Sequence, residues 1–587
     1  MPVVPEPPSE VGATIPAHTP HGVSVMFPKW EHNVLYEEGH PSVISKMETG
    51  YPRFFVNLFI QERLLAKHGK PTEAAFLYPS RKIADRCREF MKQYYAPAQE
   101  ENLIRIAEVV VAPIDEKMGM RTVPVFMVLF PQDAFPVAKQ FWQHTGDIFS
   151  SRCAEYCLHI LDKNEQHKAS HAQEKPRRAS RYAKPTGPKS PTQEEESDHA
   201  VYVEERYGRN LPLQFADQAK VVLRRRIAGL LSGKQTTIED VNKATHDELE
   251  EQRKVHGERG MLGLSEDDVY LFPSGMGAIY HAHRVARALL PDERKSVCFG
   301  FPYTDTLKIL QKWGSGCYFY GLGEDKDLDD FEAKLAGGER VLSLFCELPS
   351  NPLLKSPDLA RIRRLADQYD FLVVVDETIG NFVNVDTLTH ADIVVSSLTK
   401  IFSGDCNVMG GSMVLNPTRK YYRAIQEFLQ ADFEDIVWCE DALFVERNSR
   451  NFKERAITIN ENAEALCDYL HAHPKVDRVF YPKFICRQHY DAVKKSDGGY
   501  GGLLSIVLKD EKAAQQFYDH LHCAKGPSLG TNFTLASPYT ILAHYTELDW
   551  AEQYGVSRHL VRVSVGLEDR DHLLSLFESA LNAVDEE

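Results

Sequence analysis

The 587-residue sequence contains no apolar run approaching the ~20 residues that a membrane-spanning helix needs, so no segment is expected to cross a bilayer. It also lacks a basic excess, because 68 Lys and Arg stand against 84 Asp and Glu, a net charge of −16. That balance argues against nucleic acid or an anionic membrane surface as the main partner. The start, Met1–Pro16, lacks the basic and apolar stretches of a secretory signal, so the expected location is the cytoplasm.

The eleven cysteines show neither a disulfide framework nor the paired spacing of a metal site. Cys153 and Cys157 lie four residues apart in a segment with a helical pattern, but no second pair follows them. We therefore expect free, buried thiols and no bound metal.

Length and composition predict several domains, since 43% of the residues are hydrophobic and one domain usually takes ~100–200 residues. Residues 1–20, rich in proline, are expected to form a flexible tail. Residues 21–162 form an N-terminal extension of α and β elements, in which Val123–Phe130 is predicted to be a buried strand despite Pro124. Residues 163–199 have hardly an apolar side chain and are predicted to be a disordered linker.

From about residue 200, predicted helices and strands alternate. Met276–Leu290 is predicted to be a helix, and a further helix begins at Ser356-Pro357, where Ser suits the cap and Pro the first turn. The valine-rich strand Phe371–Val375 follows it directly. This alternation is typical of an α/β fold with a mostly parallel sheet and helices on both faces, here assigned to residues 200–420.

Residues 421–587 are predicted to form a smaller α+β domain. Its strands are Leu503–Leu508 and Leu560–Val565. In the second strand Val561 and Val563 share one face, and the alternation places Arg562 on the other.

Four polar features follow predicted strands of the central sheet or precede its first helix. They are the turn around Gly275, Asn351, Asp376, and the group from Ser397 to Lys400. Ligands of such sheets bind beyond the carboxyl ends of the strands. Taken singly, a glycine turn, a capping aspartate and a solvated lysine are all common. Together they supply the phosphate cradle, carboxylate and amine that pyridoxal phosphate requires.

These residues carry a family resemblance. Ser396-Ser-Leu-Thr-Lys400 resembles the cofactor-lysine motif of the Cys/Met-metabolism family of pyridoxal-phosphate enzymes of fold type I. Five further stretches resemble motifs of that family in the same order: Ser274-Gly-Met-Gly277, Tyr303 with Thr306, Glu347-Leu-Pro-Ser-Asn-Pro352, Asp376-Glu-Thr378, and the pair Ser528-Leu-Gly530 and Leu560–Gly566. The long extension with Thr49–Phe54, and the segment Glu205–Asn210, resemble the fungal type of cystathionine γ-synthase within the family.

The resemblance implies roles for individual residues. Lys400 would hold the cofactor and move protons. Tyr303 would stack on the cofactor ring and assist proton transfer, and Asp376 would pair with the ring nitrogen. The remaining implied contacts are the phosphate with Gly275, Met276, Ser397 and Thr399, the ring oxygen with Asn351, the cofactor with Thr378, and the substrate carboxylate with Arg562 and Ser528.

The sequence departs from the family pattern at two places. The family's Tyr-x-Arg, through which a neighbouring subunit reaches the phosphate, is matched by Tyr207 and Arg209, although Arg206 is an alternative to Arg209 and the Asn-Pro-Thr after it is missing. Glu377 replaces the usual Asn, with little effect expected. A homodimer or homotetramer with shared active sites is implied.

The activity implied is γ-replacement, which joins an O-acyl-L-homoserine, with acetyl as the favoured acyl group, to L-cysteine and gives cystathionine. Sulfide or a carbon nucleophile in place of cysteine is the nearest alternative. A lyase acting on cystathionine and a non-catalytic regulatory homologue are the others.

Overall fold

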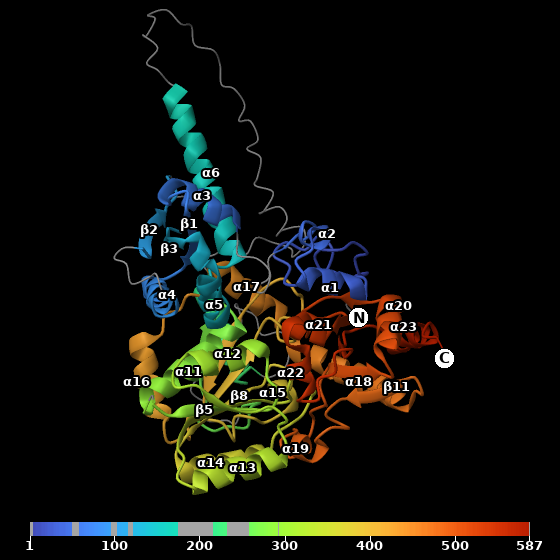
Figure 1. Cartoon of the computed structure of the whole chain (residues 1–587). Helices are drawn as coiled ribbons and strands as arrows, with labels where there is room; N and C mark the ends of the chain where they lie inside the picture. The colour runs from blue at the N-terminus through green and yellow to red at the C-terminus, as the bar shows by residue number, and fades with distance from the viewer. Residues whose placement is uncertain are drawn as a thin grey trace, which may run out of the picture.

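The computed structural model of the protein describes residues 4–49, 58–95, 103–114, 121–173, 215–231, 257–291 and 293–585. In these residues three β-sheets form the centres of three units, which follow one another from blue to red in Figure 1. No helix in the described ranges is both long and apolar enough to span a membrane. Residues 174–199 of the predicted linker, and the candidates Arg206, Tyr207 and Arg209, lie outside the described residues.

The N-terminal α/β unit is built on an antiparallel sheet with the order β1-β3-β2. Its elements are α3 (Leu58–His68), β1 (Glu73–Tyr78), α4 (Arg81–Tyr94), β2 (Arg105–Val111), β3 (Val123–Pro131), α5 (Phe135–Thr145) and α6 (Ser151–Gln173). Alternate side chains of β3 enter different cores: Val128 and Phe130 join a core with α4 and α5, whereas Met127 and Leu129 join one with α6. The predicted strand Val123–Phe130 is thus confirmed as β3.

Pro124 lies in the central strand of this sheet, a position that proline usually avoids. It pairs with Val110 of β2, but β1 pairs with β3 only from Phe126 onward. The missing N–H of Pro124 therefore falls where β3 has a neighbour on one side only.

The large unit contains a seven-stranded sheet with the order β4-β10-β9-β8-β7-β5-β6. Its strands are β4 (Val269–Phe272), β5 (Lys295–Phe299), β6 (Cys317–Tyr320), β7 (Val341–Glu347), β8 (Leu372–Asp376), β9 (Ile393–Ser397) and β10 (Gly411–Leu415). Only β10 runs antiparallel to its two neighbours. The mostly parallel sheet predicted from the sequence is confirmed.

Helices cover both faces of this sheet. One face is covered by α8 (Ala216–Ile227), α13 (Asp325–Ala336) and α14 (Leu359–Tyr369), and the other by α11 (Gly275–Leu289), α12 (Thr304–Lys312) and α16 (Tyr422–Asp432). Along β8, Val373 and Val375 enter the first core, and Leu372 and Val374 the second. The second core also contains α4 and α5 side chains, including Phe90, whose ring stacks on Trp313 at 4.9 Å between centroids. The N-terminal unit therefore packs directly on the large one.

The C-terminal α+β unit has a five-stranded sheet with the order β11-β12-β15-β14-β13. Its main elements are α18 (Phe452–Ala472), β11 (Val476–Phe480), β12 (Leu503–Leu508), α20 (Glu511–His520), β13 (Ala524–Lys525), β14 (Leu535–Pro538), β15 (Val561–Ser564) and α23 (Arg570–Asn582). The shorter helices outside this sheet are α15 (Asn381–Asn384), α17 (Cys439–Asn448), α19 (Arg487–Asp491), α21 (Tyr539–His544) and α22 (Leu548–Glu552). Val561 and Val563 pack into the C-terminal core with α18, α20 and α23, as the alternation predicted.

Residues 4–49 belong with the C-terminal unit, and helices α1 (Trp30–Glu37) and α2 (Pro41–Ile44) lie beside it in Figure 1. The backbone N–H of Trp30 donates to Asp519 at 2.7 Å, and Tyr518 donates to the carbonyl of Phe27 at 2.9 Å. Ile15 is buried with Phe533 and Leu535 of this unit. The structure differs here from the flexible tail predicted for residues 1–20, because apolar residues between 11 and 27 pack against the C-terminal unit.

Three further boundaries differ from those predicted. Helix α6 continues to Gln173, so residues 163–173 are helical where a linker was predicted. Helices α16 and α17 pack on α11 and α8 of the large unit, although they lie beyond residue 420. Helix α14 is capped by Asp358, whose side chain accepts from Arg361, rather than by Ser356.

Candidate active site

Lys400 lies three residues after β9, beyond the carboxyl end of a strand near the middle of the sheet. Its Nζ donates to the hydroxyl of Ser528 at 3.2 Å. Ser528 comes from the loop between β13 and β14, so the C-terminal unit reaches over the sheet at this point. The approach is close, since a Cβ on Gly530 would lie 2.8 Å from the Cβ of Lys400. The loop that carries Ser528 and Gly530 therefore packs directly against Lys400.

Asp376 ends β8 and pairs in register with Glu347 at the end of β7. The backbone N–H of Thr378 donates to Asp376 at 2.8 Å, and the hydroxyl of Thr378 accepts from the N–H of Ser397 at 2.8 Å. Burial raises the pKa of Asp376, and the hydrogen bond from Thr378 opposes that shift. Burial, followed by the charge of Asp376, also raises the pKa of Glu347. Two acids side by side at this edge would be stabilised by a cationic or N–H-donating partner.

The turn before α11 presents backbone N–H groups to the same place. Ser274 caps the helix, and its Oγ accepts from the N–H of Gly277 at 3.2 Å. The turn packs against the strand end carrying Ser397, because a Cβ on Gly275 would lie 2.7 Å from that of Ser397. The N–H groups of Gly275 and Met276 belong to the first helical turn, which has no acceptors within the helix and favours an anion.

Thr399 directly precedes Lys400 and lies beside Gly410. Its hydroxyl accepts from the N–H of Gly410 at 3.1 Å. This bond ties the lysine-bearing turn to the start of β10.

Arg562 extends from β15 into the site and is almost fully buried. One of its amino groups donates to Asn351 Oδ1 at 3.1 Å, and the other donates to the carbonyls of Pro527 and Ser528, each at 2.9 Å. The guanidinium also lies 4.9 Å from the ring centroid of Tyr539. A guanidinium carries several N–H donors in one plane, a geometry that suits the binding of a carboxylate ligand.

Glu347 joins several of these parts. Its two carboxyl oxygens accept from the backbone N–H groups of Tyr303, at 2.5 Å, and Asn351, at 2.9 Å. The sequence motif contained this residue, but its role as a brace for Tyr303 and Asn351 was not predicted. Glu377, by contrast, makes none of these contacts. It forms a buried ion pair with Arg259 at 2.6 Å.

One cavity brings the predicted residues together. Ten of them line it: Gly275, Met276, Tyr303, Asn351, Asp376, Thr378, Ser397, Thr399, Lys400 and Arg562. The wall also includes four residues of the N-terminal unit that no sequence motif indicated, namely Trp142, Gln143, Gly146 and Ile148. An amine, an acid at a strand end, a helix N-terminus and a buried arginine around one cavity fit the groups of pyridoxal phosphate and of an amino acid.

Comparison with known proteins agrees with this geometry. Residues 259–582 match the family described as "Cys/Met metabolism PLP-dependent enzyme", and residues 59–150 match "Fungal trans-sulfuration enzyme, N-terminal domain".

Two relatives match over almost their whole length. The chain is 47% identical to a cystathionine gamma-synthase of Neurospora crassa, over 99% of both chains. It is 42% identical to the cystathionine gamma-synthase-like enzyme iboG2 of Amanita muscaria, over 98% of this chain and 97% of the relative. Among solved structures, metB from Corynebacterium glutamicum matches with a TM-score of 0.48 and 21% identity, over 63% of this chain and 97% of that one.

Proposed function

Because the chain belongs to the Cys/Met-metabolism family of pyridoxal-phosphate-dependent enzymes, we propose that it is a cystathionine γ-synthase. It would replace the acyloxy group of O-acetyl-L-homoserine by the thiol of L-cysteine, giving cystathionine and acetate. The observation that supports this most is the single cavity shared by Lys400, Asp376, the α11 turn and Arg562. The similarity to the Neurospora crassa relative supports the choice of reaction.

In this proposal Lys400 holds the cofactor aldehyde, Asp376 pairs with its ring nitrogen, and the N–H groups of Gly275 and Met276 bind its phosphate. When bound, pyridoxal phosphate would supply an electron sink for the negative charge that develops at Cα of the substrate. Asp376 favours the protonated ring nitrogen because a cation beside it offsets the cost of burying the carboxylate.

Arg562 binds the substrate carboxylate and so fixes Cα relative to Lys400. The Nζ of Lys400, once released by the incoming amine, removes the proton from Cα and returns one later in the reaction. Ser528 orients that amine through the 3.2 Å contact. Since Arg562 also holds the Ser528 carbonyl, carboxylate binding and lysine placement are linked through one loop.

Asn351 has its amide orientation set by Arg562. Its Oδ1 accepts from the guanidinium, so the NH₂ group is the part of the side chain that can donate to the phenolic oxygen of the cofactor. Its backbone is fixed in turn by Glu347.

Product analysis tests the reaction. Purified enzyme given O-acetyl-L-homoserine should form cystathionine with L-cysteine, faster than it forms homocysteine with sulfide or a C–C product with a β-keto acid. Preference for sulfide or for the carbon acid would replace the proposed acceptor while keeping the γ-replacement. Release of ammonia and a keto acid from cystathionine alone would refute synthesis and identify a lyase.

We also propose that two or more copies share their active sites, with Tyr207 and Arg209 reaching the phosphate of a neighbour. Mixed oligomers of the K400A and R209A variants then contain sites with both lesions and sites with neither, so activity should reappear on mixing. Mixed oligomers that remain inactive would argue against this role of Arg209. A matched mixture of R206A with K400A distinguishes the alternative arginine.

A further inference from the structure

The N-terminal unit reaches the active-site cavity through the end of α5 and the loop after it. Trp142, Gln143, Gly146 and Ile148 are part of the cavity wall. These residues lie within the segment that matches the fungal N-terminal domain, and outside the segment that matches the enzyme family. The site is therefore built from two parts of the chain with separate family matches.

Gly146 touches the phosphate turn directly. Its carbonyl accepts from the hydroxyl of Ser274 at 2.9 Å, the same hydroxyl that accepts from the N–H of Gly277. Gly146 has φ of 62°, and a Cβ there would lie 2.3 Å from Ser274 Oγ and 2.5 Å from the nitrogen of Gly277. No side chain fits between this loop and the turn, so the position of one determines the position of the other.

Asp147 anchors the loop in the large unit. Its side chain is fully buried and accepts from Nε2 of His281 on α11, with distances of 3.1 and 3.2 Å to the two carboxyl oxygens. Nδ1 of His281 lies 3.4 Å from an amino nitrogen of Arg284, so the imidazole bridges Asp147 and Arg284.

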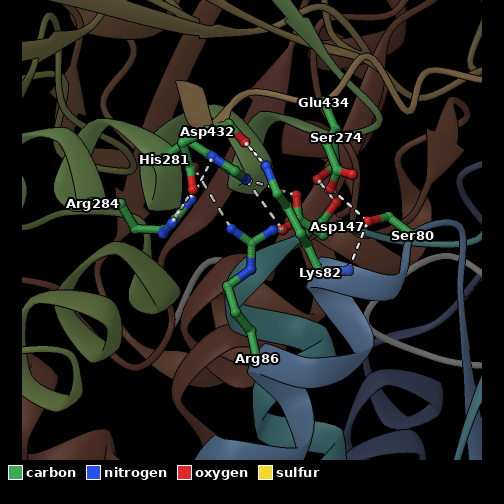
Figure 2. Close-up of polar contacts among 10 residues, drawn as sticks. Ser80, Lys82, Arg86, Asp147, Ser274, His281, Arg284, Asp432 and Glu434 are labelled. Carbon is green, nitrogen blue, oxygen red and sulfur yellow. Dashed lines mark hydrogen bonds and ion pairs between the residues drawn. The ribbon is translucent and has the colours of Figure 1, made fainter. Parts of the chain in front are cut away.

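Figure 2 shows the charges that surround this contact. Arg86 of α4 lies 3.7 Å from Asp147 and 3.8 Å from Asp432, and Arg284 forms a two-pronged ion pair with Asp432 at 2.5 and 3.0 Å. Two guanidinium groups therefore balance two carboxylates. Burial alone would raise the pKa of Asp147, but His281 and the charges of Arg86 and Arg284 hold that pKa below its usual value.

We propose that Asp147 is a positioning residue for the cofactor phosphate: it fixes the Gly146 carbonyl, which holds Ser274 and with it the N–H groups of Gly275 and Met276. This inference rests on the phosphate site proposed above. The N-terminal unit thus holds the anion-binding end of α11 at two points. Asp147 bonds His281 of that helix, and Gly146 bonds Ser274, which caps it.

The test compares two aldehydes that differ only in the phosphate. Apoenzyme carrying Asp147→Asn should bind pyridoxal phosphate at least ~10-fold more weakly than the unsubstituted apoenzyme, since a charged hydrogen-bond partner is lost. Its affinity for pyridoxal, which does not use the turn, should change little. Both dissociation constants are measured by absorbance titration, with melting temperatures recorded for each apoenzyme.

Two more variants make the result decisive. Arg86→Met removes the partly exposed arginine that lies near both Asp147 and Asp432, and it should shift the ratio of the two affinities in the same direction, by a smaller factor. Glu434→Ala removes a hydrogen bond with Ser80 at 2.5 Å across the same unit boundary, drawn in Figure 2, and should leave the ratio unchanged.

Equal weakening of both aldehydes by Asp147→Asn would overturn the proposal, because it would mean a general loss of structure. An unchanged ratio would overturn it as well. Ser274→Ala separates this failure from failure of the site itself: if it lowers the preference for pyridoxal phosphate while Asp147→Asn does not, only the role of Asp147 is refuted. If neither variant changes the preference, the phosphate does not bind at this turn.

Discussion

Replacing Arg562 by lysine tests the carboxylate site most directly. The substitution keeps a positive charge but removes the planar fork that two carboxylate oxygens can bind together. In the structure, Arg562 is held by Asn351 Oδ1 and by the carbonyls of Pro527 and Ser528. A lysine amine is a single point donor and cannot satisfy these oxygens and a carboxylate at once.

The magnitude follows from the hydrogen bonds lost. Two bonds between the guanidinium and a carboxylate, each contributing ~1.5 kcal/mol, amount to ~3 kcal/mol, or ~100-fold in affinity. The assay uses homoserine and 3-aminopropanol, which differ only in the carboxylate, and follows their binding to the holoenzyme by the change in cofactor absorbance. The R562K variant should bind homoserine ~100-fold more weakly and 3-aminopropanol within a few-fold of the unsubstituted enzyme.

The matched control is Arg558→Lys, because Arg558 is an exposed arginine that pairs with Glu552 and Asp549 outside the cavity. It should leave both affinities unchanged. If R562K weakened both amines equally, the loss would lie in the shape of the site, and the assignment of Arg562 to the carboxylate would be wrong.

Three further outcomes are expected. Lys400→Ala should leave pyridoxal phosphate bound without a covalent link, so that borohydride treatment followed by mass spectrometry finds no cofactor on the chain; a cofactor attached elsewhere would refute the assignment. Burial and Asp376 raise the folded-state pKa of Glu347, so at pH values above the usual glutamate pKa the folded apoprotein binds more protons than the unfolded chain. The melting temperature should therefore fall as the pH rises from the usual glutamate pKa toward the raised one, and Glu347→Gln should flatten this fall. An unchanged profile in the variant would contradict this explanation. Arg259→Met should cost ~3–5 kcal/mol in denaturant unfolding by leaving Glu377 buried and unpaired, and Glu377→Gln in the same chain should recover part of it; additive losses would show that the two side chains are not coupled.

Much of the central sheet and of its site was predictable because the signals are local. Valine-rich strands followed at once by Asp376 or by the lysine motif predict both the strand and the edge at which its polar residues lie. The family inferred from ordered motifs is confirmed by the match over residues 259–582. The roles of the individual side chains stay predictions, although the structure places ten of them around one cavity.

The missed features depend on partners far along the chain. Gly146 and Asp147 belong to no sequence motif, and their contacts with Ser274 and His281 form only when α5 packs against α11. The segment around Ile15 has the composition of a loose tail, but its burial requires a surface made by residues beyond 520.

Two other differences from the predicted boundaries have local causes. Ser356 and Asp358 are both suitable caps, and Asp358 is the one whose carboxyl accepts from the backbone of Arg361. Residues 163–173 are polar, yet a helix already nucleated by the buried part of α6 extends at low cost through residues that tolerate helix.

The packing of residues 4–49 on the C-terminal unit has a consequence for biosynthesis. Trp30 and its partner Asp519 are 489 residues apart in the sequence. At ~5–20 residues per second, a ribosome takes on the order of 25–100 s to make the intervening chain. Throughout that interval Val25 and Phe27, fully buried in the finished protein, lack Leu542, the residue of the C-terminal unit that completes their core. The earliest part of this polypeptide to emerge must therefore wait for nearly the last, and a chaperone that shields short apolar stretches would be needed most at its beginning.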